Sequence, residues 1–239
     1  MKIIVTGALG HIGSSLIRYL PEAFPEAHIV LIDSLITQRF SSLFNLPSNG
    51  KFSFYQEDVR EFDFSKIVTQ GDVIINLSAI TDAAGSFNNA ELLEKNNYNC
   101  TETIANACIK SNARLITISS TSVYGSTKNI VDESSTGDDL NPQSPYATTK
   151  LMEEDLVRKL SLEKDLQAVI LRFGTIYGYS PGMRFHTAVN KFCWQSVLDK
   201  PLTIWETAYE QKRPYLDLND AVKALCFFIK GDIFDGEIY

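Results

Sequence analysis

Tyr146 and Lys150 stand four residues apart at the start of a segment with a helical pattern. Side chains at positions i and i+4 share one face of a helix, so the phenol and the ammonium would point into the same space. A free tyrosine has a pKa of about 10, and a nearby cation favours its phenolate. The spacing predicts that Tyr146 is a general acid and base, although an exposed pair on an amphipathic helix has the same spacing.

A run of hydroxyl side chains, residues 119–122 (SSTS), ends an apolar segment that has the pattern of a strand. Ligands of open α/β sheets bind at the carboxyl ends of the strands, so these hydroxyls would face a ligand crevice. A serine there can donate a hydrogen bond to a substrate oxygen and hold Tyr146 in line. The run therefore favours a chemical role for Tyr146 and Lys150.

Gly7, Gly10 and Gly13 lie between the first apolar segment and the first helical pattern. A dinucleotide-binding turn needs glycine for its tight bend, for close approach of the pyrophosphate and for helix packing. The helix N-terminus then offers free N–H groups to the phosphates. The first gap is one residue longer than in the usual Rossmann spacing, so the match to that fingerprint is imperfect.

Two acidic residues follow the second and third apolar segments. Asp33 stands 20 residues after Gly13, where a carboxylate accepts hydrogen bonds from an adenosine ribose and repels a 2′-phosphate. This favours NAD over NADP, although an aspartate here can also start a turn. Asp58 and Val59 occupy the place from which an aspartate meets the adenine amino group while a valine packs against the ring; alone, Asp58 would be a loop acid.

Short apolar runs alternate with helical patterns, which predicts an α/β fold with a doubly wound parallel sheet of Rossmann type. We expect strands at 2–6, 29–33, 52–56, 73–77, 115–119 and 168–173, and helices at 12–20, 90–110 and 146–160. Residues 1–173 would form the NAD-binding domain with the catalytic residues. Residues 174–239 would form a smaller substrate lobe, with a helix at 187–198, short strands at 202–205 and 214–218, and a helix at 220–230.

The sequence ends in a strand-like pattern, 236–239, so we expect the substrate lobe to be truncated. Phe227, Phe228 and Ile229 would then have less to pack against, and the substrate site would be weak unless more chain or a partner subunit completes it.

Composition narrows the class of protein. The chain has 239 residues, 44% hydrophobic and 21% charged, which is typical of a globular domain. It has 22 basic and 29 acidic residues, a net charge of −7, and its basic residues are scattered, so nucleic acid and anionic membranes are not expected partners. Without a membrane span or signal-peptide pattern we expect a cytoplasmic protein, and the four cysteines fit no metal spacing.

Together these motifs resemble the extended short-chain dehydrogenase/reductase superfamily, specifically the NAD-dependent sugar epimerase/dehydratase family, which acts on nucleotide-activated sugars. The resemblance covers nearly the whole chain. Its further motifs are Asn76-Leu77-Ser78-Ala79, Asn97, Val123-Tyr124-Gly125, Glu153, Leu171-Arg172-Phe173, Tyr177-Gly178 and 213–221.

The resemblance implies a role for each matching residue. Tyr146 would be the acid/base, Lys150 would bind the nicotinamide ribose and lower the Tyr146 pKa, and Ser120 would be the catalytic hydroxyl. The NAD site would comprise Gly7, Leu9, Gly10, His11, Ile12, Gly13, Asp33, Asp58, Val59, Leu77, Ser78, Ala79, Asn97, Tyr146 and Lys150. The substrate site would comprise Thr81, Ser120, Ser122, Thr175 and Arg213, and no metal is expected. Alternatively, Arg213 could be a solvated charge and Asn97 a helix-kink residue.

Thr121 and Ser122 stand where the family's 4,6-dehydratases have an aspartate and a glutamate, and Thr175 replaces a frequent asparagine. Dehydration is therefore disfavoured, and we expect an epimerase that works through a transient ketone. A nucleotide-sugar reductase, oxidase or decarboxylase is the nearest alternative, and a non-catalytic NAD-sensing module is an alternative of another class. Relatives commonly form homodimers, which we also expect here.

Overall fold

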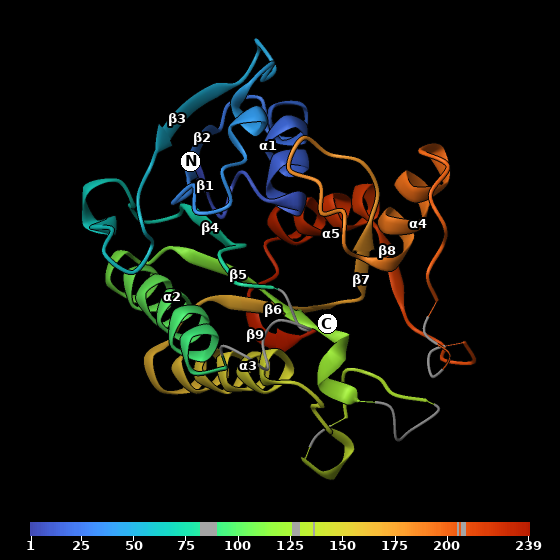
Figure 1. The fold of residues 1–239 in the computed structure, drawn as a ribbon. Helices are drawn as coiled ribbons and strands as arrows, with labels where there is room; N and C mark the ends of the chain where they lie inside the picture. Colours follow the sequence, from blue (N-terminus) through green and yellow to red (C-terminus); the bar gives the residue numbers. More distant parts are fainter. Residues whose placement is uncertain (82–89, 126–129, 136, 205, 207–208) are drawn as a thin grey trace.

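A seven-stranded parallel sheet runs through the centre of the protein in a computed structural model, which describes residues 1–81, 90–125, 130–135, 137–204, 206 and 209–239 (Figure 1). The order of its strands is β3-β2-β1-β4-β5-β6-β9. Their bounds are β1 Lys2–Thr6, β2 His28–Ile32, β3 Lys51–Tyr55, β4 Val73–Asn76, β5 Arg114–Ser120, β6 Ala168–Phe173 and β9 Asp235–Ile238. The order reverses between β1 and β4, as in a doubly wound sheet, so the predicted fold class is confirmed.

Helices cover both faces of the sheet. The helices α1 (His11–Ala23) and α5 (Leu218–Gly231) pack on one face, and α2 (Ala90–Ser111) and α3 (Pro145–Lys164) lie side by side on the other (Figure 1). Successive strand residues point to opposite faces, so Ile3 and Val5 join one core and Ile4 joins the other. Burial on both faces explains why the strands read as continuous apolar runs.

The beginning of α3 is specified by its sequence. Ser144 is the N-cap, and its side chain accepts a hydrogen bond from the Ala147 N–H at 3.2 Å. Pro145 follows at the first helical position, where its missing N–H costs nothing. Tyr146 is thereby held in the first turn of the helix.

The segment after β6 divides into two parts. β7 (Thr175–Tyr177) and β8 (Tyr215–Asp217) form a separate two-stranded sheet beside α4 (Ala188–Val197) (Figure 1). By contrast, α5 packs on α1 and β9 pairs with β6, so both belong to the main body. The expectation that Phe227, Phe228 and Ile229 lack packing is wrong for Phe228 and Ile229, which are only 8% and 5% exposed, whereas Phe227 is 61% exposed.

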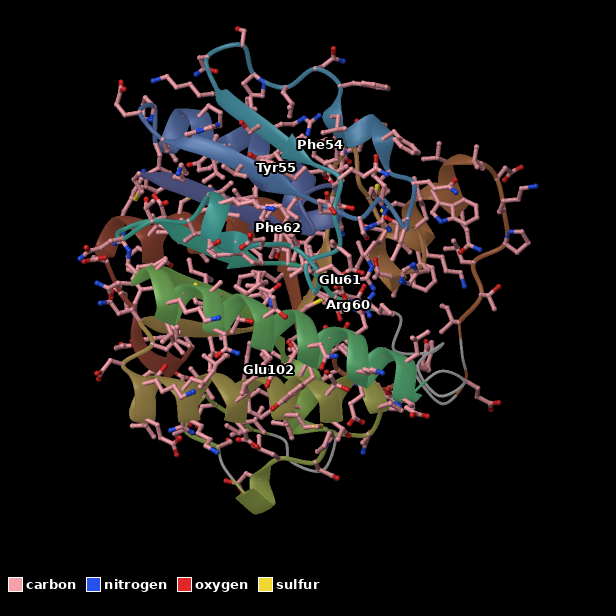
Figure 2. The ribbon with its side chains drawn as sticks, turned by 90° about the vertical axis from the view of Figure 1, so that its left-hand side faces the viewer. Phe54, Tyr55, Arg60, Glu61, Phe62 and Glu102 are labelled. Atoms are coloured by element: carbon pink, nitrogen blue, oxygen red, sulfur yellow. The ribbon has the colours of Figure 1, made fainter. Side chains whose placement is uncertain are left out.

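Most predicted elements form within a few residues of their expected bounds. The strand expected at 202–205 does not form over 202–204, and residue 205 lies outside the described residues. The rings of Tyr55 and Phe62, both labelled in Figure 2, are 5.4 Å apart and pack against the core between the sheet and the helices α2 and α3. Among the described residues, no helix combines the length and hydrophobicity that a membrane crossing requires.

Candidate active site

A cavity of about 530 Å³ opens at the carboxyl ends of β1, β4, β5 and β6. It brings together most of the predicted site residues: Gly7, Gly10, His11, Ile12, Gly13, Leu77, Ala79, Thr81, Ser120, Ser122, Tyr146, Lys150, Thr175 and Arg213. Six predicted residues do not line it: Leu9, Asp33, Asp58, Val59, Ser78 and Asn97. Segments far apart in sequence therefore meet at the edge of the sheet where ligands of this architecture bind.

The glycine-rich turn is shaped by close backbone contacts. Gly7 has φ +62°, and a Cβ there would lie 2.6 Å from the carbonyl oxygen of Leu77. A Cβ at Gly13 would lie 2.6 Å from the carbonyl oxygens of Gly7 and Ala8. A side chain at Gly7 would press on the loop after β4, and one at Gly13 would press on the turn itself, so the turn keeps the tight form that a pyrophosphate needs at a helix N-terminus.

Asp33 fixes the same turn from the end of β2. One carboxylate oxygen accepts a hydrogen bond from the Leu9 N–H at 3.0 Å, and the other accepts from the Leu35 N–H at 2.9 Å. Arg39 lies near both the turn and Asp33, and its pKa is lowered because burial outweighs the attraction of the Asp33 charge. No motif in the sequence marks this arginine.

Asp58 forms an ion pair with the nearby Arg60. The Arg60 guanidinium binds both carboxylate oxygens, and these hydrogen bonds hold the Asp58 pKa below its usual value. Val59 is buried in the core beside α2. The structure thus places these two residues outside the lining of the cavity.

Lys150 is buried beside Tyr146, with its Nζ 5.9 Å from the centre of the tyrosine ring. Ser120, at the end of β5, faces the same cavity, and its Oγ accepts a hydrogen bond from the Ser122 N–H at 3.1 Å. The Ser122 Oγ is buried without a partner among the described residues. The expected catalytic trio of Ser120, Tyr146 and Lys150 therefore converges on one cavity.

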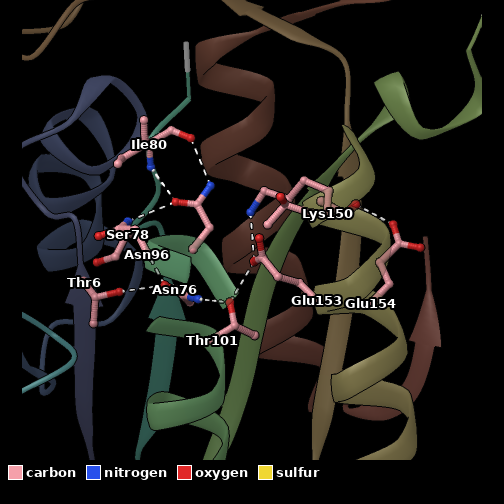
Figure 3. A network of polar contacts seen from close by, with 12 residues as sticks. Thr6, Asn76, Ser78, Ile80, Asn96, Thr101, Lys150, Glu153 and Glu154 are labelled. Carbon is pink, nitrogen blue, oxygen red and sulfur yellow. Dashed lines mark hydrogen bonds and ion pairs between the residues drawn. The ribbon is translucent and has the colours of Figure 1, made fainter. Parts of the chain in front are cut away.

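Two buried carboxylates on α3 connect this trio to the sheet. Glu153 forms an ion pair with Lys150 at 3.0 Å (Figure 3). Glu154 forms an ion pair with Arg172 of β6 at 2.6 Å and also accepts a hydrogen bond from Ser119. Because these contacts join β5 and β6 to α3, they fix the position of Ser120 relative to Tyr146.

Asn97 acts on the loop after β4. Its side-chain oxygen accepts a hydrogen bond from the Ile80 N–H at 2.8 Å, and its amide nitrogen donates to the Ile80 carbonyl at 3.0 Å. The side chain is fully buried and does not reach the cavity. Asn97 therefore shapes the loop that carries Leu77 and Ala79.

Cations gather on the far wall of the cavity. Arg213 lines it and donates a hydrogen bond to Gln211, and Thr175 lies beside it on β7. Arg184 and His186 also line this wall, and Arg184 donates to the Thr81 carbonyl at 3.0 Å. Nothing in the spacing of Arg184 and His186 marks them as site residues; only the fold brings them to the cavity.

The buried His11 joins the glycine-rich turn to the segment after β7. Its Nε2 lies 2.8 Å from the Gly178 carbonyl oxygen, to which it can donate in one tautomer. Burial lowers the His11 pKa, and the positive charges of Arg184 and Arg39 lower it further. The imidazole therefore favours its neutral form.

Comparison with known proteins agrees with this geometry. Residues 3–239 match the model of the NAD dependent epimerase/dehydratase family. An uncharacterized UDP-glucose epimerase, YtcB of Bacillus subtilis, is 32% identical, with 94% of this chain and 71% of that protein covered. A dTDP-D-glucose 4,6-dehydratase of Dictyostelium discoideum is 28% identical over all of this chain and 57% of its own length.

A solved structure extends the comparison to the fold. A tyrosine-to-phenylalanine mutant of UDP-glucuronic acid 4-epimerase from Bacillus cereus, in complex with UDP-4-deoxy-4-fluoro-glucuronic acid and NAD, superposes with a TM-score of 0.90 at 31% identity. The match covers all of this chain and 76% of that one.

Proposed function

The chain belongs to the NAD dependent epimerase/dehydratase family, and on that basis we propose that it epimerises a nucleotide-activated sugar. The observation that carries the proposal is the convergence of Ser120, Tyr146 and Lys150 on the cavity that also holds the glycine-rich turn. A hydroxyl of the sugar and the cofactor can therefore meet at one point.

The residues present fit NAD, the cofactor of this family. The turn at Gly7 and Gly13 leaves space that a Cβ would fill, and the N-terminus of α1 offers its N–H groups there. Asp33 is placed beside the turn, where a carboxylate can accept hydrogen bonds from the ribose. When bound, NAD supplies a reversible hydride acceptor.

Tyr146 takes the proton from the sugar hydroxyl while the Lys150 charge stabilises the phenolate. Ser120 donates a hydrogen bond to the reacting oxygen, which becomes a carbonyl. Tyr146 then returns the proton when the carbonyl is reduced on its other face. The product differs from the substrate in one stereocentre, with no net oxidation.

Epimerisation is favoured over dehydration by the charge of the cavity wall. Among the described residues that line the cavity there is no aspartate or glutamate. Removal of water from the sugar needs an additional acid and base, and Ser122 cannot supply a carboxylate. An NAD-dependent reductase or oxidase would use the same trio, so the product must separate these reactions.

The substrate is proposed to be a UDP-sugar. Arg184 and Arg213 supply cations for a diphosphate and for an acidic sugar ring, and His186 lies beside Arg184. Similarity to the Bacillus cereus enzyme makes UDP-glucuronic acid the first sugar to test, followed by UDP-glucose, UDP-N-acetylglucosamine and dTDP-glucose.

The test is incubation of the chain with NAD and each sugar, followed by proton NMR of the product. We expect a C4 epimer with no accumulation of NADH. Stoichiometric NADH would favour an oxidase, and a keto-deoxy sugar would favour a dehydratase. NAD binding without conversion of any sugar would favour a non-catalytic module.

We also propose the functional division into residues 1–173 for NAD and 174–239 for the substrate, and a cytoplasmic homodimer. The exposed sides of α2 and α3, which include Leu92 and Leu162, support a dimer built on these helices. Light scattering would test it, since a mass near 27 kDa, that of one chain, would contradict it.

A further inference from the structure

Glu153 is a buried carboxylate that the proposed reaction does not use. It lies on α3 one turn after Lys150, and its side chain is 3% exposed. Its Oε2 accepts hydrogen bonds from Lys150 Nζ at 3.0 Å and from Thr101 Oγ1 at 2.7 Å. A carboxylate is costly to bury unless it is paired, so its direct contact with the candidate catalytic lysine needs an explanation.

We propose that Glu153 is a positioning residue: it is the counter-ion that keeps Lys150 charged and holds the ammonium in place beside Tyr146. The proposal rests on the proposed roles of Tyr146 and Lys150. It adds a residue that touches neither substrate nor cofactor and acts through the lysine.

The surroundings of Lys150 show why a counter-ion matters. Burial lowers the pKa of this lysine, yet the net pKa is raised, because the charge and the hydrogen bond of Glu153 outweigh burial, with help from Tyr146. Without Glu153, burial would be the largest remaining influence, and it favours the neutral amine. A neutral Lys150 would no longer stabilise the Tyr146 phenolate.

The other ionisable groups near Lys150 do not replace Glu153. On α2, burial raises the pKa of the Cys100 thiol to about 12, so it carries no charge at neutral pH. Glu154, also on α3, is paired with Arg172 of β6, which also donates a hydrogen bond to the Tyr124 hydroxyl. Beyond Cys100, Asp58 is paired with Arg60.

A chain of hydrogen bonds fixes Glu153 as an acceptor (Figure 3). The Ser78 backbone N–H donates to Asn76 Oδ1 at 3.1 Å, which orients the amide so that Nδ2 is its donor. Nδ2 donates to Thr101 Oγ1 at 3.1 Å, and the one Thr101 proton must then go to Glu153. The direction of every bond follows from a backbone group, so Oε2 of Glu153 is the acceptor in both of its hydrogen bonds, while its Oε1 is buried with no partner among the described residues.

The reactivity of Lys150 toward acetic anhydride tests the proposal, because only the neutral amine reacts and Lys150 lines the open cavity. We expect Glu153→Gln to raise acetylation of Lys150 about tenfold at pH 8, which corresponds to a pKa lower by about one unit. Lys159 and Lys164, which are exposed on the same helix, are internal references in the peptide mass spectra. Thr101→Val is the matched control, since it removes a hydrogen bond to Glu153 but leaves the ion pair.

The second measurement is NAD affinity between pH 7 and pH 9.5. We expect it to fall by about a factor of two toward pH 9.5 in Glu153→Gln, since a pKa lower by about one unit brings deprotonation of Lys150 to the upper end of this range, and to change little in the wild type. Equal Lys150 acetylation in the wild type and Glu153→Gln, or an equal rise in Thr101→Val, would overturn the proposal. If Glu153→Gln does not fold, the wild type alone decides: Lys150 must not acetylate at a lower pH than the exposed lysines. None of these readouts needs sugar turnover, so they stay informative if the proposed epimerase activity is absent.

Discussion

Replacing Gly7 with alanine tests the claim that the glycine-rich turn is shaped by its contact with the loop after β4. Gly7 has φ +62°, and the new Cβ would lie 2.6 Å from Leu77 O and 2.9 Å from Ser78 N. The left-handed backbone costs about 1–2 kcal/mol for a residue with a Cβ. Pressing that Cβ into neighbouring backbone costs about 1–3 kcal/mol more, as in overpacked cores.

Gly71 offers a matched control, because it has φ +80° and nothing within 4 Å of the added Cβ. Gly71→Ala should therefore destabilise the fold by about 1–2 kcal/mol, the backbone cost alone. Gly7→Ala should cost about 2–5 kcal/mol in all, the sum of the backbone and packing costs. Urea unfolding of both variants measures the difference.

Calorimetric titration with NAD adds the functional readout. We expect Gly7→Ala to weaken NAD binding at least tenfold, about 1.4 kcal/mol, because the turn must move away from Leu77. Gly71→Ala should bind NAD like the wild type. Equal unfolding free energies for the two variants, together with unchanged NAD affinity in Gly7→Ala, would refute the steric argument.

Three further predictions follow from the site. Tyr146→Phe should keep NAD binding but lower turnover by roughly 10² or more, the usual scale for loss of an acid/base, and near-normal turnover would contradict its role. The Asp33 carboxylate should make NAD bind at least tenfold tighter than NADP, because it repels the 2′-phosphate. Asp33→Asn should narrow this affinity ratio, because the positive charge of the nearby Arg39 then attracts the 2′-phosphate without opposition. Equal affinities of the wild type for NAD and NADP would contradict this prediction. Burial lowers the His11 pKa, so the unfolded chain binds the proton more readily, and stability should fall as pH drops through about 6.5. The decrease in the free energy of unfolding between pH 7.5 and pH 5.5 should be smaller in His11→Gln than in the wild type. Denaturant unfolding of both proteins at the two pH values measures this difference.

The main sheet could be predicted from the sequence because each of its early strands is a short apolar run bounded by polar residues. The bounds of β1 and β6 match the expected ones, and the other four predicted strands start or end one residue away. The last part of the chain was harder to predict. α5 and β9 follow a turn-rich segment, and only tertiary packing returns them to the main sheet beside α1 and β6.

The site residues that could be predicted share a local signal. Gly7, Gly10 and Gly13 are marked by spacing at a strand-to-helix turn, and Tyr146 and Lys150 by spacing on a helix. Arg184 and His186 carry no such signal, because they reach the cavity only through the path of the chain after β7. The direct contact between Glu153 and Lys150 also lacks one, since helical spacing places them near each other but does not show that both are buried.

The net charge of the chain does not predict the local charge of the cavity. The chain carries a net charge of −7, and this argues against long polyanions, which would contact a large part of the surface. The cavity has the opposite local character, since its described lining includes Lys150, Arg39, Arg184 and Arg213 and no carboxylate. At physiological salt, charges more than about 8 Å away are largely screened, so a ligand inside the cavity experiences its lining more than the distant surface. A small anionic ligand such as a sugar diphosphate is therefore compatible with an acidic protein, because the fold gathers cations that the sequence scatters over more than 170 residues.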